Sequence, residues 1–182
     1  MKVFINKPNE NWIVDRMCNE WYELAPEITT KNILESDIIW LLSDWTWKNI
    51  QSSLLASKKV IVQIHHIDPS KFGANALRDF LERDTFTNAY ICPNKKVAED
   101  VYQYTGTTTQ IHVIGNWFNS NIWKPYSQTK DECRAYLGLP QDKFIIGSFQ
   151  RDTEGKDLRT PKLSKGPDIL CDYLQRDRDW ET

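Results

Sequence analysis

The stretch Val60–Ile67, VIVQIHHI, decides the fold of this chain. It is dense in β-branched residues and contains neither glycine nor proline, which predicts a strand that ends in two histidines. A second run, DIIWLL at Asp37–Leu42, is apolar without interruption, as is typical of a strand covered on both faces. Shorter runs of the same kind predict strands at Lys2–Asn6, Ala89–Cys92 and Gln110–Ile114.

Helix-length patterns separate these strands. Apolar residues recur at helical spacing in Asn11–Leu24, and Trp12 and Trp21 are expected to face the core from this helix. Further helices are expected at Trp45–Ala56, Ala76–Phe86 and Lys95–Tyr104. Strands that alternate with helices imply βαβ crossovers. We therefore expect an α/β chain with a Rossmann-like, mostly parallel sheet.

The second part of the chain has a different composition. Gly115–Thr129 is rich in asparagine and is interpreted as a connector between domains. A short helix at Lys130–Leu137, a strand at Phe144–Ile146 and a helix at Pro167–Gln175 are expected to follow it. One strand and one helix cannot complete a sheet, so residues 1–127 are expected to form one domain with its connector, and residues 128–182 an incomplete second Rossmann-like domain.

Composition and charge exclude several classes of protein. The chain has 182 residues, of which 40% are hydrophobic and 12% are aromatic, enough for a packed core. The net charge of -2 disfavours nucleic-acid binding by bulk charge. Four widely spaced cysteines, with no CxxC pair, indicate reduced thiols and no zinc site. No signal peptide or membrane-spanning run is visible, so a cytoplasmic protein, or one peripheral to a membrane, is expected.

The positions of the seven glycines exclude two phosphate-binding motifs. No two of them are closer than eight positions, so neither GxGxxG nor GxxxxGK[ST] is present. An enzyme that uses nicotinamide or flavin, or a P-loop kinase, is therefore disfavoured. The metalloprotease motif HExxH and the nucleophile elbow GxSxG are also absent from the sequence.

A basic loop carries the strongest chemical signal. Arg151 follows the expected strand at Phe144–Ile146, and Lys165-Gly166 stands where the last helix is expected to begin. A helix N-terminus offers free backbone N–H groups and a partial positive charge, which favour an anion such as a diphosphate. A solvent-exposed basic loop without a ligand would have the same composition, so both interpretations stay open on the residues alone.

Three other groups of residues invite a functional interpretation. His65 and His66 point to opposite faces of a strand and cannot form a joint metal pair, although one of them could face the ligand-binding edge of the sheet. Trp45-Thr46-Trp47 could be a sugar-stacking platform, but core packing is favoured. The charged run Asp177-Arg178-Asp179 is interpreted as a solvated helix end and not as a metal site.

Three segments together resemble the retaining glycosyltransferases of the GT-B fold, family 4. The connector VIGNWFNSNIWKP, Val113–Pro125, resembles the VIPNGVDxxxFxP element of that family, with Asn116 at its asparagine. VIVQIHHID resembles the family's strand that ends in a histidine, and His65 matches that histidine better than His66. IGSFQR and KLSKGPDIL resemble the pieces that hold the donor diphosphate, although Arg151 and Lys165 are fourteen positions apart here.

The resemblance implies a nucleotide-sugar-dependent transferase that moves a hexose-type sugar, with retention, to a glycan or lipid-linked acceptor. It implies an acceptor-side domain over residues 1–127 and an incomplete donor-binding domain over residues 128–182. It also implies that Arg151, Lys165 and Gly166 bind the donor diphosphate, that His65 is catalytic, and that no metal or cofactor is needed beyond the nucleotide sugar as co-substrate. The alternative is a non-catalytic α/β binding or regulatory module.

Overall fold

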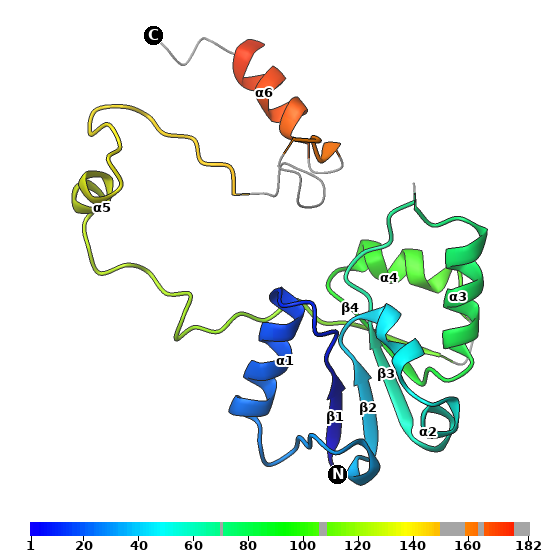
Figure 1. The fold of residues 1–182 in the computed structure, drawn as a ribbon. Helices are drawn as coiled ribbons and strands as arrows, with labels where there is room; N and C mark the ends of the chain where they lie inside the picture. Colours follow the sequence, from blue (N-terminus) through cyan, green and yellow to red (C-terminus); the bar gives the residue numbers. More distant parts are fainter. Residues whose placement is uncertain (70, 106–108, 150–158, 164–165, 177–182) are drawn as a thin grey trace. The chain divides into compact units, whose positions relative to one another are not determined.

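The computed structural model describes residues 1–69, 71–105, 109–149, 159–163 and 166–176. The chain divides into two compact units, Met1–Lys124 and Pro125–Thr182. Each unit has its own secondary structure (Figure 1).

The first unit is built on a five-stranded sheet in which every neighbouring pair is parallel. The strands lie in the order β1-β2-β3-β4-β5 (Figure 1). Their bounds are β1 Val3–Asn6, β2 Ile38–Leu41, β3 Lys59–Gln63, β4 Ala89–Cys92 and β5 Gln110–Val113. The expected α/β class and the parallel, Rossmann-like character of the sheet are confirmed.

Helical segments connect the strands. They are α1 Ile13–Leu24, the 3-10 turns η1 Ile33–Glu35 and η2 Asp44–Asn49, α2 Ser52–Ser57, α3 Ala74–Asp84 and α4 Lys95–Tyr102. Each strand presents alternate residues to the two faces of the sheet. On one face Ile5 of β1 packs with Met17 and Cys18 of α1. On the other face Leu55 of α2 and Phe80 of α3 join the larger core, together with residues of α4.

The sequential strand order constrains the connections. Each connection joins a strand to its next neighbour, always in the same direction across the sheet. A crossover connection that passes over one face therefore has the opposite handedness from one that passes over the other face. The β1–β2 connection through α1 therefore has the opposite hand from those through α2, α3 and α4. The backbone therefore leaves the carboxyl ends of β1 and β2 toward opposite faces of the sheet.

Two expected elements of the first unit differ in the structure. The helix expected at Trp45–Ala56 is split into η2 and α2, because Ile50 is extended (φ −115°, ψ 138°) and packs against the larger core. The strand expected at Val60–Ile67 ends at Gln63. Only one further ladder bond follows, from Ile64 N–H to the Ile91 carbonyl at 3.0 Å, since β4 itself ends at Cys92.

The second unit contains two helices in its described part, α5 Lys130–Tyr136 and α6 Pro167–Arg176. The strand expected at Phe144–Ile146 is wrong, because this segment has no ladder partner among the described residues and Phe144 is 78% exposed. A lone extended segment leaves its backbone groups unpaired, so it gains nothing over solvated coil. No sheet of a second Rossmann-like domain is present in the described part of this unit.

No helix among the described residues is both long enough and apolar enough to cross a bilayer.

Candidate functional site

The carboxyl ends of the parallel strands bring several polar segments to one edge of the sheet. Lys7 follows β1 closely, Ser43 follows β2, His65 follows β3, Asn94 follows β4 and Asn116 follows β5. In open α/β sheets this edge is where ligands bind, because the loops there are free to diverge while the strands hold their bases in place. It is therefore the candidate functional edge of the first unit.

A hydrogen bond anchors His65 at this edge. Its Nε2 lies 2.9 Å from the carbonyl oxygen of Leu42, at the end of β2. A carbonyl oxygen only accepts, so Nε2 carries the proton and donates it. The neutral ring then has Nδ1 as an acceptor. His65 is half-buried and His66 is exposed, so the two adjacent imidazoles occupy different surroundings, although both lie after the end of β3 and not on a strand.

The connector that carries the family resemblance meets β3 beside His65. The Gln63 side chain is buried, and its Nε2 donates to Oδ1 of Asn116 at 3.4 Å. The next residue, Trp117, packs edge-on against Trp21 of α1 with the ring centroids 5.9 Å apart. Asn116 thus contacts Gln63, which lies two positions before His65 and about fifty positions away from Asn116 in the sequence.

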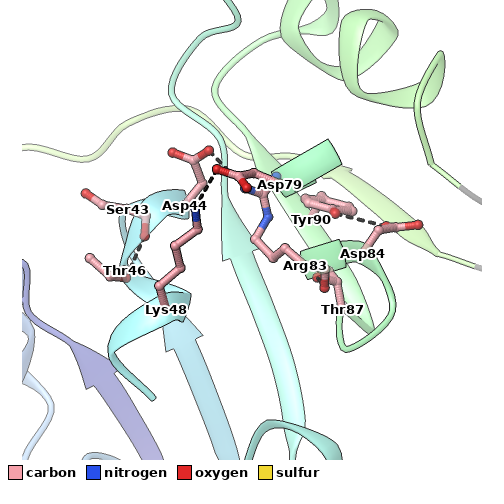
Figure 2. Close-up of polar contacts among 9 residues, drawn as sticks. All are labelled: Ser43, Asp44, Thr46, Lys48, Asp79, Arg83, Asp84, Thr87 and Tyr90. Atoms are coloured by element: carbon pink, nitrogen blue, oxygen red, sulfur yellow. Dashed lines mark hydrogen bonds and ion pairs between the residues drawn. The ribbon is translucent and has the colours of Figure 1, made fainter. Parts of the chain in front are cut away.

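An ion pair between a buried arginine and a partly exposed aspartate supports the loop after β2, and the sequence did not single it out. Arg83 of α3 is only 3% exposed, and its Nη1 donates to Oδ2 of Asp44 at 3.0 Å (Figure 2). Its guanidinium lies over the Phe80 ring, 4.7 Å from the centroid. The Nε and Nη2 atoms of Arg83 are buried without a partner among the described residues. The only local hint in the sequence is that Arg83 lies three residues after Phe80, on the same helix face, and this spacing alone does not distinguish a buried arginine from a solvated one.

Tyr90 of β4 extends this network. Its hydroxyl donates to Oδ1 of Asp84 at 2.9 Å (Figure 2), and burial raises the pKa of the phenol, so Tyr90 stays protonated. Thr46 of η2 is fully buried, and its hydroxyl donates to the Ser43 carbonyl at 2.6 Å. The network fixes η2 against α3 and β4, and we interpret it as structural support for the edge.

The loop after β1 is held by another residue that sequence reasoning missed. Asp15 of α1 is 5% exposed, and its carboxylate accepts the backbone N–H groups of Asn9 at 2.9 Å and Asn11 at 2.5 Å. Both asparagines have positive φ, 60° and 57°, which asparagine tolerates better than most residues. A cavity of about 590 Å³ adjoins this loop. It is lined by Lys7, Asn9, Asn11, Trp12, Ile13, Asp15, Arg16 and Asn19.

The tryptophans at this edge only partly follow the expected packing. Trp47 is buried and belongs to the larger core, which confirms core packing for that residue. Trp45 is 43% exposed. Trp12, which was expected in the core, precedes the first turn of α1 and is 47% exposed. The prediction for Trp12 is wrong because α1 begins at Ile13, two residues after the predicted start at Asn11.

The predicted diphosphate site falls mainly outside the described residues. Arg151 and Lys165 lie outside them, as does the charged run at 177–179. Gly166 is described and has φ of +67°, a conformation that favours glycine. Its carbonyl accepts the Leu170 N–H at 3.0 Å, which starts the hydrogen bonding of α6. It lines a cavity of about 460 Å³ with Ile146, Gly147, Ser148, Ile169, Leu170 and Tyr173.

Neither a metal centre in the described residues nor a known relative of the chain was found. In the described ranges, no cluster of three or more His, Cys, Asp or Glu side chains is placed to hold a metal ion. Comparison of the chain with protein-family models, with curated proteins and with solved structures gave no match.

Proposed function

We propose that this chain contributes to a nucleotide-sugar-dependent glycosyltransferase that retains anomeric configuration. The observation that carries the proposal is the position of His65, at the carboxyl end of the central strand and two residues from the Gln63–Asn116 contact. The family resemblance assigns functional importance to His65 and to the connector that contains Asn116. The contact between Asn116 and Gln63, two positions before His65, supports that assignment.

In the proposed reaction, the bond between C1 of the sugar and the donor diphosphate breaks, and a bond from C1 to an acceptor hydroxyl oxygen forms. The acceptor loses its proton and the nucleoside diphosphate leaves. Negative charge develops on the departing diphosphate, so Arg151, Lys165 and the backbone at Gly166 would stabilise the transition state electrostatically. His65 would orient the sugar by accepting a hydroxyl hydrogen bond at Nδ1. No metal or further cofactor is assigned to this step.

The second candidate function is a non-catalytic α/β binding or regulatory module. It is favoured by the bond from His65 Nε2 to the Leu42 carbonyl. That bond satisfies a backbone acceptor at the end of β2, and a purely structural histidine would do the same. The two candidates differ in whether the chain binds nucleoside diphosphates and releases them from sugar donors.

Diphosphate binding can be tested by isothermal titration of the chain with UDP, GDP and ADP. One of these is expected to bind, and Lys165→Ala is expected to weaken binding by more than about 1 kcal/mol, because a charge-assisted hydrogen bond is lost. Lys143→Ala, in the same unit, serves as the matched control. A smaller loss for Lys165→Ala, or no binding of any diphosphate, would favour the non-catalytic module.

The role of His65 can be tested by the hydrolysis of nucleotide sugars, in which water replaces the acceptor. His65→Gln is expected to lower kcat by about tenfold or more with little change in KM, since orientation matters most in the transition state. His66→Gln is the control and should stay within about twofold of the unmodified chain. Equal effects of the two substitutions would remove the assignment of His65.

A further inference from the structure

Two half-exposed tryptophans form an aromatic surface at the candidate edge. Trp12 precedes α1 and Trp45 lies in η2, and their ring centroids are 6.4 Å apart with the planes tilted by 31°. They are 47% and 43% exposed. Large aromatic side chains dominate buried cores, so a pair of them left half in water at a ligand-binding edge is informative. Neither ring is needed for the larger core, in which Trp47 takes part.

The backbone under both rings is fixed. The Asn6 side chain, at the end of β1, donates to the Thr46 carbonyl at 2.9 Å, which joins the Trp45 segment to the strand before Trp12. On the other side, the Asp15 carboxylate holds the loop through Asn9 and Asn11. A surface with a fixed backbone loses less conformational entropy when a ligand binds.

Polar side chains surround the cavity of about 590 Å³ that Trp12 lines. Three of them are the carboxamides of Asn9, Asn11 and Asn19, which both donate and accept hydrogen bonds. Two cationic side chains in the lining have contacts within the first unit. Lys7 donates to the Asn19 carboxamide at 3.2 Å, and Arg16 lies 3.5 Å from Glu20.

We propose that this aromatic surface and its cavity, the Trp12–Trp45 site, bind a neutral oligosaccharide. A pyranose has an apolar face of C–H groups that packs on an indole ring, and hydroxyl groups at its edge that pair with carboxamides. The lining does not require a multiply charged ligand, because Arg16 lies beside the Glu20 carboxylate and the Asp15 carboxylate accepts backbone N–H groups. The saccharide would be the acceptor of the proposed transfer. This acceptor role rests on the proposed function, whereas saccharide binding itself does not.

The site can be tested with cellotetraose, maltotetraose, chitotetraose and mannotetraose as separate probes. Each is titrated into the chain while the indole N–H signals of the eight tryptophans are followed by NMR. At least one saccharide is expected to shift the Trp12 and Trp45 signals, at concentrations up to about 10 mM. Trp12→Ala and Trp45→Ala are each expected to weaken binding by about fivefold or more, and Trp12→Phe, which keeps an aromatic face, by less.

Tyr102→Ala is the matched control, since Tyr102 is a 71% exposed aromatic residue on α4. It should leave saccharide binding unchanged, and thermal melts of each variant establish that it is folded. Absence of any shift with all the probes, or equal losses for Trp12→Ala and Tyr102→Ala, would overturn the proposal. Saccharide binding without diphosphate binding would support the Trp12–Trp45 site and overturn the proposed transferase function. Failure of one proposal can therefore be distinguished from failure of the other.

Discussion

Arg83 shows how a single buried charge shapes the candidate edge. It is charged and almost fully buried, it has one carboxylate partner in Asp44, and two of its nitrogens have no partner in the described structure. Removing one partner of such a pair leaves the other charge uncompensated, whereas replacing the buried charge by an apolar side chain of similar size is often neutral. The two members of this pair therefore contribute unequally to stability.

Asp44→Ala is expected to destabilise the first unit by about 2–3 kcal/mol, because the Arg83 guanidinium would then be buried without a carboxylate. Arg83→Met is expected to change stability by less than about 1 kcal/mol, since Asp44 is 40% exposed and can be solvated. Urea unfolding followed by tryptophan fluorescence measures both changes. A cost for Arg83→Met as large as that for Asp44→Ala would mean that the pair itself stabilises the fold.

The Asp15 carboxylate, which holds the loop after β1, is expected to make the free energy of unfolding depend on pH. Burial alone would raise the pKa of its carboxyl group, but the N–H groups of Asn9, Asn11 and Glu10 and the charge of Lys7 outweigh burial and lower it. Because the pKa in the folded state is below that in the unfolded state, the contribution is present above about pH 4 and is lost as the pH falls through the folded value.

The substitution Asp15→Asn should remove this dependence. It is expected to cost about 1–2 kcal/mol at neutral pH, because one carboxamide oxygen replaces two charged acceptors. Its urea midpoint should fall less steeply than that of the unmodified chain between about pH 5 and pH 2. Parallel pH profiles for the two proteins would show that Asp15 does not hold the loop through its charge.

At the scale of elements, α5 depends on its first turn. Thr129 and Glu132 form a capping box, in which each side chain binds the backbone N–H of the other residue. The helix has seven residues and no fully buried side chain, so neither length nor packing compensates for a lost cap. The donated bonds from Thr129 also keep the pKa of Glu132 below its ordinary value.

Thr129→Ala is therefore expected to weaken α5 by about 1 kcal/mol. The Cα chemical shifts of residues 130–136 should move toward coil values, while those of α1 stay unchanged. Ser127→Ala, which lies just outside the capping box, is the control. Unchanged shifts in α5 after Thr129→Ala would contradict a helix held by its cap.

The elements also differ in how far the sequence predicted them. Strands β2 and β3 were predicted at Asp37–Leu42 and Val60–Ile67, because continuous apolar and β-branched runs are a local signal. Phe144–Ile146 has the same local signal and is not a strand. A strand forms only when a neighbour accepts its hydrogen bonds, and no residue pattern within the segment reports whether that neighbour exists.

At the scale of the whole molecule, the cysteines report on the two units separately. Cys18 and Cys92 are fully buried in the first unit, and burial raises the pKa of each thiol to about 11. Cys133 and Cys171 are in the second unit and are at least partly exposed. A thiol with a raised pKa and no access to solvent reacts slowly, because the thiolate is the nucleophile.

A thiol-reactive chromophore such as Ellman's reagent should therefore label Cys133 and Cys171 quickly in the native protein. Cys18 and Cys92 should react only when urea unfolds the first unit, in step with the loss of tryptophan fluorescence. Mass spectrometry of the labelled peptides identifies each site. Fast labelling of Cys92 under native conditions would show that the core around β4 opens without global unfolding.

The candidate site was likewise only partly predictable from the residues. His65 and Asn116 could be singled out because each stands in a recognisable run next to a strand. Arg83 and Asp15 could not, because charged residues on amphipathic helices are usually solvated. Trp12 was assigned to the core from helical spacing alone, although the helix begins at Ile13 and leaves that ring half in water.

Local patterns in the chain were thus enough to establish the α/β class and the succession of strands and helices in the first unit, since hydrophobic periodicity and turn residues act over a few positions. The strand order, the face that α1 covers and the pairing of Arg83 with Asp44 arose only from tertiary structure. These features depend on contacts between distant segments, whose free energy is gained only when the whole sheet assembles. The Trp12–Trp45 site belongs to this second group, because its two rings come from different elements and meet only at the folded edge.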